Sequence, residues 1–175
     1  DNEFFIAMEY IPGVDLRELQ KALTRRQKGL PIRISLRILY DILSALDYAH
    51  HRVDTFGKPM NIVHRDVNPR NVMLSVRGEV KLIDFGVAKS SAKQDQTVGH
   101  IIKGKFAYMA PEQIVNGDKS AQTDVFSLGC MLYRICAGRS AFGGDLQQVL
   151  DKTLKGDYTS LKAILYEKGP PVPYI

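Results

Sequence analysis

The most informative part of the sequence is HRDVNPRN, residues 64–71. It lies between two short apolar runs, residues 62–63 and 72–74, which predict strands on either side of a loop. An Asp and an Asn five residues apart in a loop are, on their own, more often turn formers whose side chains bond to nearby backbone. The motifs that follow in the sequence favour a functional site instead.

Two further motifs stand downstream of this loop. Asp84-Phe85-Gly86 begins thirteen residues after Asn71, and Ala110-Pro111-Glu112 follows a stretch with little hydrophobic periodicity. His-Arg-Asp, Asn, Asp-Phe-Gly and Ala-Pro-Glu, in this order, are the signature set of protein kinases, and a chance match of all four is very improbable. The sequence therefore resembles the C-terminal lobe of a eukaryotic-type protein kinase of the serine/threonine branch.

The resemblance covers about residues 3–157. It implies an α+β, mainly α-helical fold, a protein-kinase-like C-lobe with a short hairpin at the catalytic site and the last strand of the N-lobe. Residues 1–11 would supply that strand and the hinge, and residues 12–175 a C-lobe truncated before its final helices. The connector at 51–61 and the phrase GKFAYM at 104–109 most resemble bacterial members of the branch.

Hydrophobic periodicity predicts most of the elements without the resemblance. Leu16, Leu19 and Leu23 recur on one helical face until Gly29-Leu30-Pro31 ends the pattern. The nearly all-apolar run Asp124–Ala137 predicts a helix buried through the middle of the domain. The other predictions are helices at 32–51 and 146–155, a hairpin joining 72–74 to 80–83, and a strand at 4–8.

Composition excludes several classes of protein. The 175 residues are 45% hydrophobic and 25% charged, and they contain no run of the ~20 apolar residues that a membrane span needs. The net charge of +5 comes from residues 15–37, a helical patch without interleaved aromatic side chains, so we expect no nucleic-acid partner. Two cysteines without paired spacing favour a reducing, cytoplasmic location. Because residue 1 is Asp, we expect a longer chain.

The resemblance implies a site for ATP and Mg²⁺ around the HRDVNPRN loop. Asp66 matches the residue that accepts the proton of the substrate hydroxyl, a role that contributes about 10²–10⁴-fold in rate. Asn71 and Asp84 match the Mg²⁺ ligands, and both are the hard oxygen ligands that Mg²⁺ prefers. Turn capping by Asn71 and Asp84 is the competing interpretation.

The resemblance also implies an adenine pocket. The backbone of Glu9 and Ile11 would bind the base, and Met8 would stand behind it. Met73 and Leu16 would pack below the ring, on a surface left partly uncovered. Taken alone, Met8 and Met73 are more often core residues. Asp15 either reaches the ribose or a basic substrate, or it caps the helix that follows.

Two positions depart from the family pattern. Asn68 stands where serine/threonine kinases usually carry a Lys that contacts the γ-phosphate, and Lys105 stands where they usually carry Thr. In the family these two positions approach each other near the catalytic Asp. We therefore predict that Lys105 returns the missing cation to Asp66, with Arg70 as the alternative catalytic replacement.

Three further residues have expected roles outside catalysis. Asp124 normally holds the backbone of the catalytic loop, and Glu112 normally pairs with an Arg that this sequence does not offer beyond Arg139. Arg65, beside the catalytic Asp, is typical of regulation by loop phosphorylation, and Thr97 is the best-placed hydroxyl.

The predicted function is phosphoryl transfer from ATP to Ser/Thr hydroxyls of protein substrates. The sequence contains no Gly-rich loop, strand Lys or helix Glu ahead of the hinge, so we expect these 175 residues alone to be nearly inactive. The expected partners are a protein substrate and the missing N-lobe of the same chain. The alternative function is a pseudokinase or signalling scaffold that binds nucleotide or partners without efficient catalysis.

Overall fold

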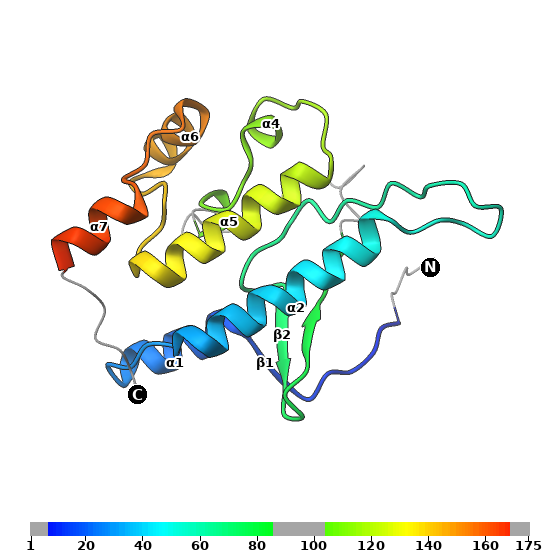
Figure 1. Cartoon of the computed structure of the whole chain (residues 1–175), viewed down its shortest axis with the longest axis horizontal. Coiled ribbons are helices and arrows are strands. Elements are labelled where there is room, and N and C mark those ends of the chain that lie inside the picture. The colour runs from blue at the N-terminus through cyan, green and yellow to red at the C-terminus, as the bar shows by residue number, and fades with distance from the viewer. Residues whose placement is uncertain (1–6, 86–103, 169–175) are drawn as a thin grey trace, which may run out of the picture.

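The computed structural model describes residues 7–85 and 104–168, with side chains as far as Ile164. Helices predominate in these ranges, so the α+β, mainly helical prediction is confirmed for them (Figure 1). The elements in chain order are β1 (Gly13–Asp15), α1 (Leu16–Arg25), α2 (Ile32–His50), β2 (Val72–Ser75), β3 (Val80–Leu82), α4 (Pro111–Ile114), α5 (Ala121–Ala137), α6 (Leu146–Lys155) and α7 (Leu161–Lys168).

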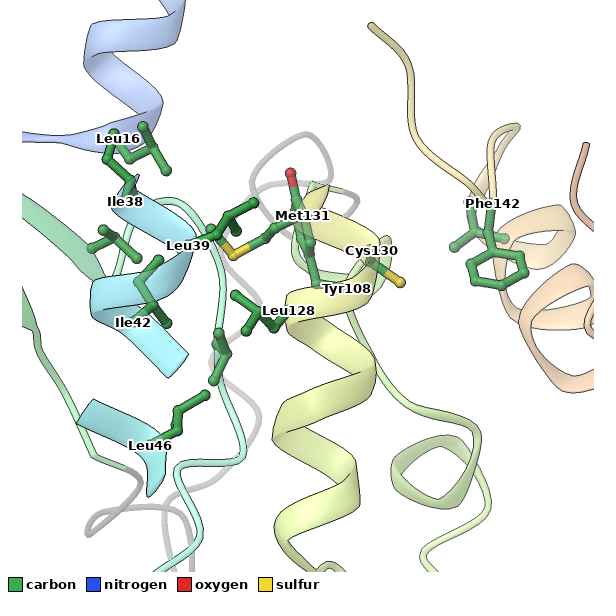
Figure 2. Close-up of a cluster of buried hydrophobic side chains, with 13 residues drawn as sticks. Leu16, Ile38, Leu39, Ile42, Leu46, Tyr108, Leu128, Cys130, Met131 and Phe142 are labelled. Carbon is green, nitrogen blue, oxygen red and sulfur yellow. The ribbon is translucent and has the colours of Figure 1, made fainter. Parts of the chain in front are cut away.

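The core lies between the two long helices. Ile38, Ile42 and Leu46 recur every four residues along α2 and turn one buried face toward Leu128 and Met131 of α5 (Figure 2). Figure 1 shows α5 between α2 on one side and α6 and α7 on the other. The prediction of a buried central helix at 124–137 is therefore confirmed, with the helix beginning three residues earlier.

A small antiparallel sheet, in the order β1-β2-β3, lies beside α2. The predicted β2–β3 hairpin is confirmed, and Val72 pairs with Leu82 in it. The sequence analysis missed β1, because Pro12-Gly13 breaks the pattern there. A Cβ atom at Gly13 would lie 2.1 Å from the carbonyl oxygen of Leu74, so only glycine permits this close pairing.

One other prediction from the sequence needs correction. Ile62 and Val63 form no strand. The backbone that follows them bonds to a side chain of α5 rather than to a neighbouring strand. The helix α7 was not anticipated. The predicted strand at 4–8 lies mainly outside the described residues, and Ala7 and Met8 are not in a strand. No helix in the described ranges has the length and apolar character to span a bilayer.

Helix ends follow the capping residues. The side chain of Asp15 accepts a hydrogen bond from the backbone of Glu18, and Asp145 does the same for Gln148. The cap that was one of the two predicted roles of Asp15 is thus confirmed. Helix α1 ends at Arg25, before Gly29, because Gln27 adopts a left-handed backbone with φ of 54°. The cap at Asp15 orients α1 so that its first turn meets the HRDVNPRN loop.

Candidate active site

The buried carboxylate of Asp124 organises the loop that carries Asp66. One of its oxygens lies 2.8 Å from the backbone nitrogen of His64 and the other lies 2.7 Å from that of Arg65. The ring Nε2 of His50, from α2, lies 2.8 Å from the first oxygen. Asp124 is fully buried, and its predicted role of holding the loop backbone is confirmed. These bonds also hold Arg65 at a φ of 65°, which turns the chain toward Asp66.

The imidazole of His64 joins this loop to the end of β3. Its Nε2 donates to the carbonyl oxygen of Ile83 at 2.9 Å, and its Nδ1 accepts from the backbone nitrogen of Asp66 at 3.2 Å. One donating and one accepting nitrogen define a neutral ring. The ring also packs against Phe85, with centroids 4.6 Å apart. His64 therefore fixes Asp66 relative to the Asp84-Phe85 segment.

Both carboxylate oxygens of Asp66 have polar partners. Nζ of Lys105 lies 2.6 Å from Oδ2, and Nδ2 of Asn68 lies 3.1 Å from Oδ1. Nδ2 of Asn68 also donates to the Asp66 carbonyl at 2.9 Å. Lys105 and Asn68 therefore both contact Asp66, as the predicted approach of their positions requires. Lys105 reaches Asp66 from a segment 39 residues further along the sequence.

Arg70 occupies a different place from Lys105. Its side chain is exposed and lines the same cavity as Asp66, while its backbone nitrogen donates to Oδ1 of Asn68 at 3.0 Å. Among the described residues, Lys105 forms an ion pair with Asp66. Of the two predicted replacements, Lys105 is thus the one whose side chain contacts Asp66.

The side-chain oxygens of Asn71 and Asp84 are suitable ligands for a magnesium ion. The amide nitrogen of Asn71 donates to the carbonyl of Asp66 at 2.8 Å, which leaves its oxygen to serve as a ligand. The backbone of Ile83 donates to the carbonyl of Asn71 at 2.9 Å and so brings the exposed Asp84 beside it. No cluster of three or more His, Cys, Asp or Glu occurs in the described ranges. Two protein oxygens suit Mg²⁺, which commonly completes its shell with water and phosphate.

The predicted adenine-binding residues have unequal exposure. Met8 is 68% exposed, Glu9 is exposed, and Ile11, Asp15 and Met73 are half-buried. Glu9 pairs with Lys81 of β3, and this hydrogen bond raises the pKa of the lysine. This contact ties the predicted hinge to the sheet.

Leu16 departs from its prediction. It is fully buried in the core between α1, α2 and β2, because the cap at Asp15 turns the first residue of α1 inward. The expectation that Leu16 lies on a partly uncovered surface is therefore wrong. Met8 and Met73 retain exposed area, as predicted.

Glu112 has a partner that the sequence analysis did not foresee. Its Oε1 accepts a hydrogen bond from the hydroxyl of Thr123, at 2.5 Å, in the first turn of α5. The side chain of Gln113 donates to the carbonyl of Arg65 at 2.8 Å. The Ala-Pro-Glu segment is thus joined both to α5 and to the catalytic loop. The predicted phosphorylation site Thr97 lies outside the described residues.

Arg17 is a site residue that the sequence analysis missed. It lies on a wall of the cavity that also contains Asp66, and its backbone nitrogen donates to the carbonyl of Pro69 at 3.1 Å. The sequence analysis counted this arginine only within the basic helical patch at residues 15–37. Its local sequence gives no signal of this place, because the loop that Arg17 meets lies much further along the chain, at residues 64–71.

The fold and this arrangement of side chains define a protein kinase. Residues 1–172 match the protein kinase domain, and the chain belongs to that family. The match extends beyond the predicted 3–157 at both ends.

Three of the curated proteins that resemble this chain are bacterial kinases. The chain is 36% identical over 156 residues to the tyrosine-protein kinase MasK of Myxococcus xanthus, which covers 88% of this chain and 24% of that protein. It is 36% identical over 145 residues to the probable serine/threonine-protein kinase PknB of Bifidobacterium longum, covering 81% and 19%. Identity to the serine/threonine-protein kinase PknB of Mycobacterium tuberculosis is 33% over 143 residues, covering 81% and 21%. The chain spans about a quarter or less of these relatives.

Proposed function

We propose that these residues form the C-terminal lobe of a serine/threonine protein kinase that transfers phosphate from ATP to protein substrates. The observation that carries the proposal is the set of contacts around Asp66. Lys105 and Asn68 hold its two oxygens, and the amide of Asn71 binds its backbone. The Gly-rich loop, the strand Lys and the helix Glu of the kinase signature would lie in sequence outside these 175 residues.

The reaction needs positioning and charge neutralisation more than covalent chemistry. The substrate hydroxyl oxygen bonds to the γ-phosphorus, the bond from that phosphorus to the bridging oxygen of ADP breaks, and the hydroxyl proton passes to Asp66. Lys105 holds Asp66 in place and adds positive charge beside the transferring group. His64 and Asp124 keep the loop backbone fixed, so that Asp66 meets the hydroxyl without rearrangement.

Bound Mg²⁺ would neutralise charge on the β- and γ-phosphates. The amide oxygen of Asn71 and the carboxylate of Asp84 would hold it. The backbone of Glu9 and Ile11, with Met8 and Met73 near the base, would hold the adenine.

The test uses the full-length protein incubated with labelled ATP, Mg²⁺ and a protein substrate mixture. We expect label on serine and threonine after acid hydrolysis, and loss of the label in Asp66→Asn and in Asn71→Ala. The control is Asp151→Asn, an exposed residue of α6 whose carboxylate pairs only with Lys155 among the described residues. Label that persists in Asp66→Asn would refute the assignment of the base.

Two other functions have an observation in their favour. The relative named a tyrosine-protein kinase supports transfer to tyrosine, and acid hydrolysis separates phosphotyrosine from the other products. The absence of Lys at position 68 supports a scaffold that binds nucleotide without transferring phosphate. ATP binding with no labelled product from the wild-type protein would favour the scaffold.

A further inference from the structure

A cavity of about 150 Å³ opens beside Asp66. Its walls come from the first turn of α1, the catalytic loop and the segment that begins at Gly104. Since a water molecule takes up about 30 Å³ in the liquid, a carboxylate or phosphoryl group fits inside together with water. Three cationic side chains line this cavity, namely those of Arg17, Arg70 and Lys105.

Arg17 is held in an unusual position for a surface arginine. Its guanidinium packs over Gly104, where an added Cβ atom would lie 3.5 Å from Nη1 and 3.7 Å from Nη2. Its Nε is buried and has no hydrogen-bond partner within residues 7–85 and 104–164. A buried N–H group without a partner costs free energy. The side chain keeps this position at the cavity wall beside Gly104 in spite of that cost.

The charges on the cavity wall are not balanced. Lys105 is paired with Asp66, whereas Arg17 and Arg70 form no ion pair with the described residues. The two acidic side chains at the start of α1 are engaged elsewhere, because Asp15 caps the helix and Glu18 pairs with Lys21. As far as the structure describes the chain, the positive charges of Arg17 and Arg70 are therefore uncompensated beside Asp66.

We propose that this cavity selects protein substrates with an acidic or phosphorylated side chain close to the residue that is phosphorylated. The proposal rests on the proposed function, which brings the substrate hydroxyl to Asp66. Because Asp66 itself lines the cavity, the anion belongs to a residue within a few positions of that hydroxyl; an extended chain advances about 3.3 Å per residue. Arginine suits this role, since its planar donors bind carboxylate and phosphate in pairs.

The experiment compares peptides with the full-length protein. Each peptide has one serine and differs only in its neighbours, which are Asp and Glu, phosphoserine, Ala, or Lys. We expect kcat/KM to be about 10-fold higher for the acidic and phosphorylated peptides than for the alanine peptide, as a charge-assisted hydrogen bond provides. The difference between Asp and phosphoserine neighbours shows which anion the site prefers.

Variants of Arg17 test the assignment. Arg17→Ala removes the preference, and Arg17→Glu shifts it toward peptides with Lys neighbours, a gain that a misfolded variant cannot produce. Arg25→Ala is the matched control, because Arg25 lies in the last turn of the same helix and outside the cavity. An acid preference that survives in both Arg17 variants overturns the proposal.

Two further outcomes are distinguishable. If the Arg17 variants change the KM for ATP and leave the peptide preference intact, the cavity serves the nucleotide and the proposal is overturned.

A binding experiment tests the preference without catalysis. It measures, by fluorescence anisotropy, the binding of a peptide whose serine is replaced by alanine. Should the wild-type protein transfer no phosphate, the proposed function fails. The selectivity then stands if acidic peptides bind about 10-fold more tightly to wild type than to Arg17→Ala, and falls otherwise.

Discussion

Nζ of Lys105 lies 2.6 Å from Oδ2 of Asp66, although 39 residues separate them in the sequence. Lys105 follows Gly104, on which the guanidinium of Arg17 packs. The contact therefore joins the start of the segment at 104 to the catalytic loop and supplies positive charge at the same time. A lysine at position 68 would supply the positive charge, but it would not join these two segments.

The first prediction concerns Lys105. Lys105→Ala should lower kcat about 10- to 100-fold in the full-length kinase, the range expected for loss of one charge-assisted hydrogen bond in the site. The measurement is steady-state phosphorylation of a peptide substrate. Lys21→Ala, an exposed lysine paired with Glu18, is the control and should keep wild-type kcat.

A second substitution checks the reason for the loss. Nδ2 of Asn68 lies 3.1 Å from the other oxygen of Asp66, so Lys105→Ala combined with Asn68→Lys should recover much of the lost kcat. If Lys105→Ala keeps near-normal kcat while Arg70→Ala loses it, Arg70 is the true replacement and the assignment of Lys105 is wrong.

The second prediction concerns the buried carboxylate in α5. Asp124→Ala leaves the backbone N–H groups of His64 and Arg65, and the ring of His50, without their acceptor. Breaking a buried charged interaction of this kind costs about 3–5 kcal/mol. Hydrogen exchange followed by mass spectrometry should show peptides covering residues 64–71 exchanging much faster than in wild type, with activity lost.

The matched control for Asp124 is Asp151→Ala in α6. That carboxylate is exposed and pairs with Lys155, so its loss should change stability by less than about 0.5 kcal/mol. Equal protection of the catalytic loop in Asp124→Ala and wild type would contradict the role assigned to Asp124.

The third prediction concerns the two free cysteines of α5. Burial raises the pKa of the Cys130 thiol to about 12, and burial also raises the pKa of the less buried Cys136. Because the thiolate is the reactive form, an alkylating agent at pH 8 should modify Cys136 first and Cys130 only after unfolding. At pH values below the pKa of Cys136, the rate of its alkylation should rise about tenfold per pH unit. Comparable labelling of both cysteines in the folded protein, read by peptide mass spectrometry, would refute this.

Local sequence was sufficient for the elements that carry their own signals. The helices α1, α2 and α6 have an apolar stripe and a break or cap in the sequence, and the hairpin has its turn. Strand β1 has only three residues and forms because β2 lies beside Gly13. Its sequence therefore shows no periodicity from which the strand could be predicted. The resemblance, which rests on the order of the motifs, predicted that Asp66, Asn71 and Asp124 lie near one another.

Long-range packing decided the rest of the site. The burial of Leu16, the bond from Thr123 to Glu112 and the place of Arg17 on the cavity wall all depend on how distant segments meet. Each of these residues has an ordinary local role in the sequence, as a helix leucine, a helix threonine or a surface arginine. Only the approach of α1, α5 and the HRDVNPRN loop brings them to the site.

The last prediction separates capping from positioning. Asp15 and Asp145 are both N-caps that bond to the backbone three residues on, at 2.8 and 2.9 Å. Replacing either with alanine should cost about 1 kcal/mol and speed hydrogen exchange in the first turn of its own helix by about fivefold. Only Asp15→Ala should also lower kcat/KM for acidic peptides, because α1 carries Arg17 to the cavity and α6 lines no part of it. Equal kinetic effects of the two substitutions would mean that the start of α1 has no part in positioning the substrate.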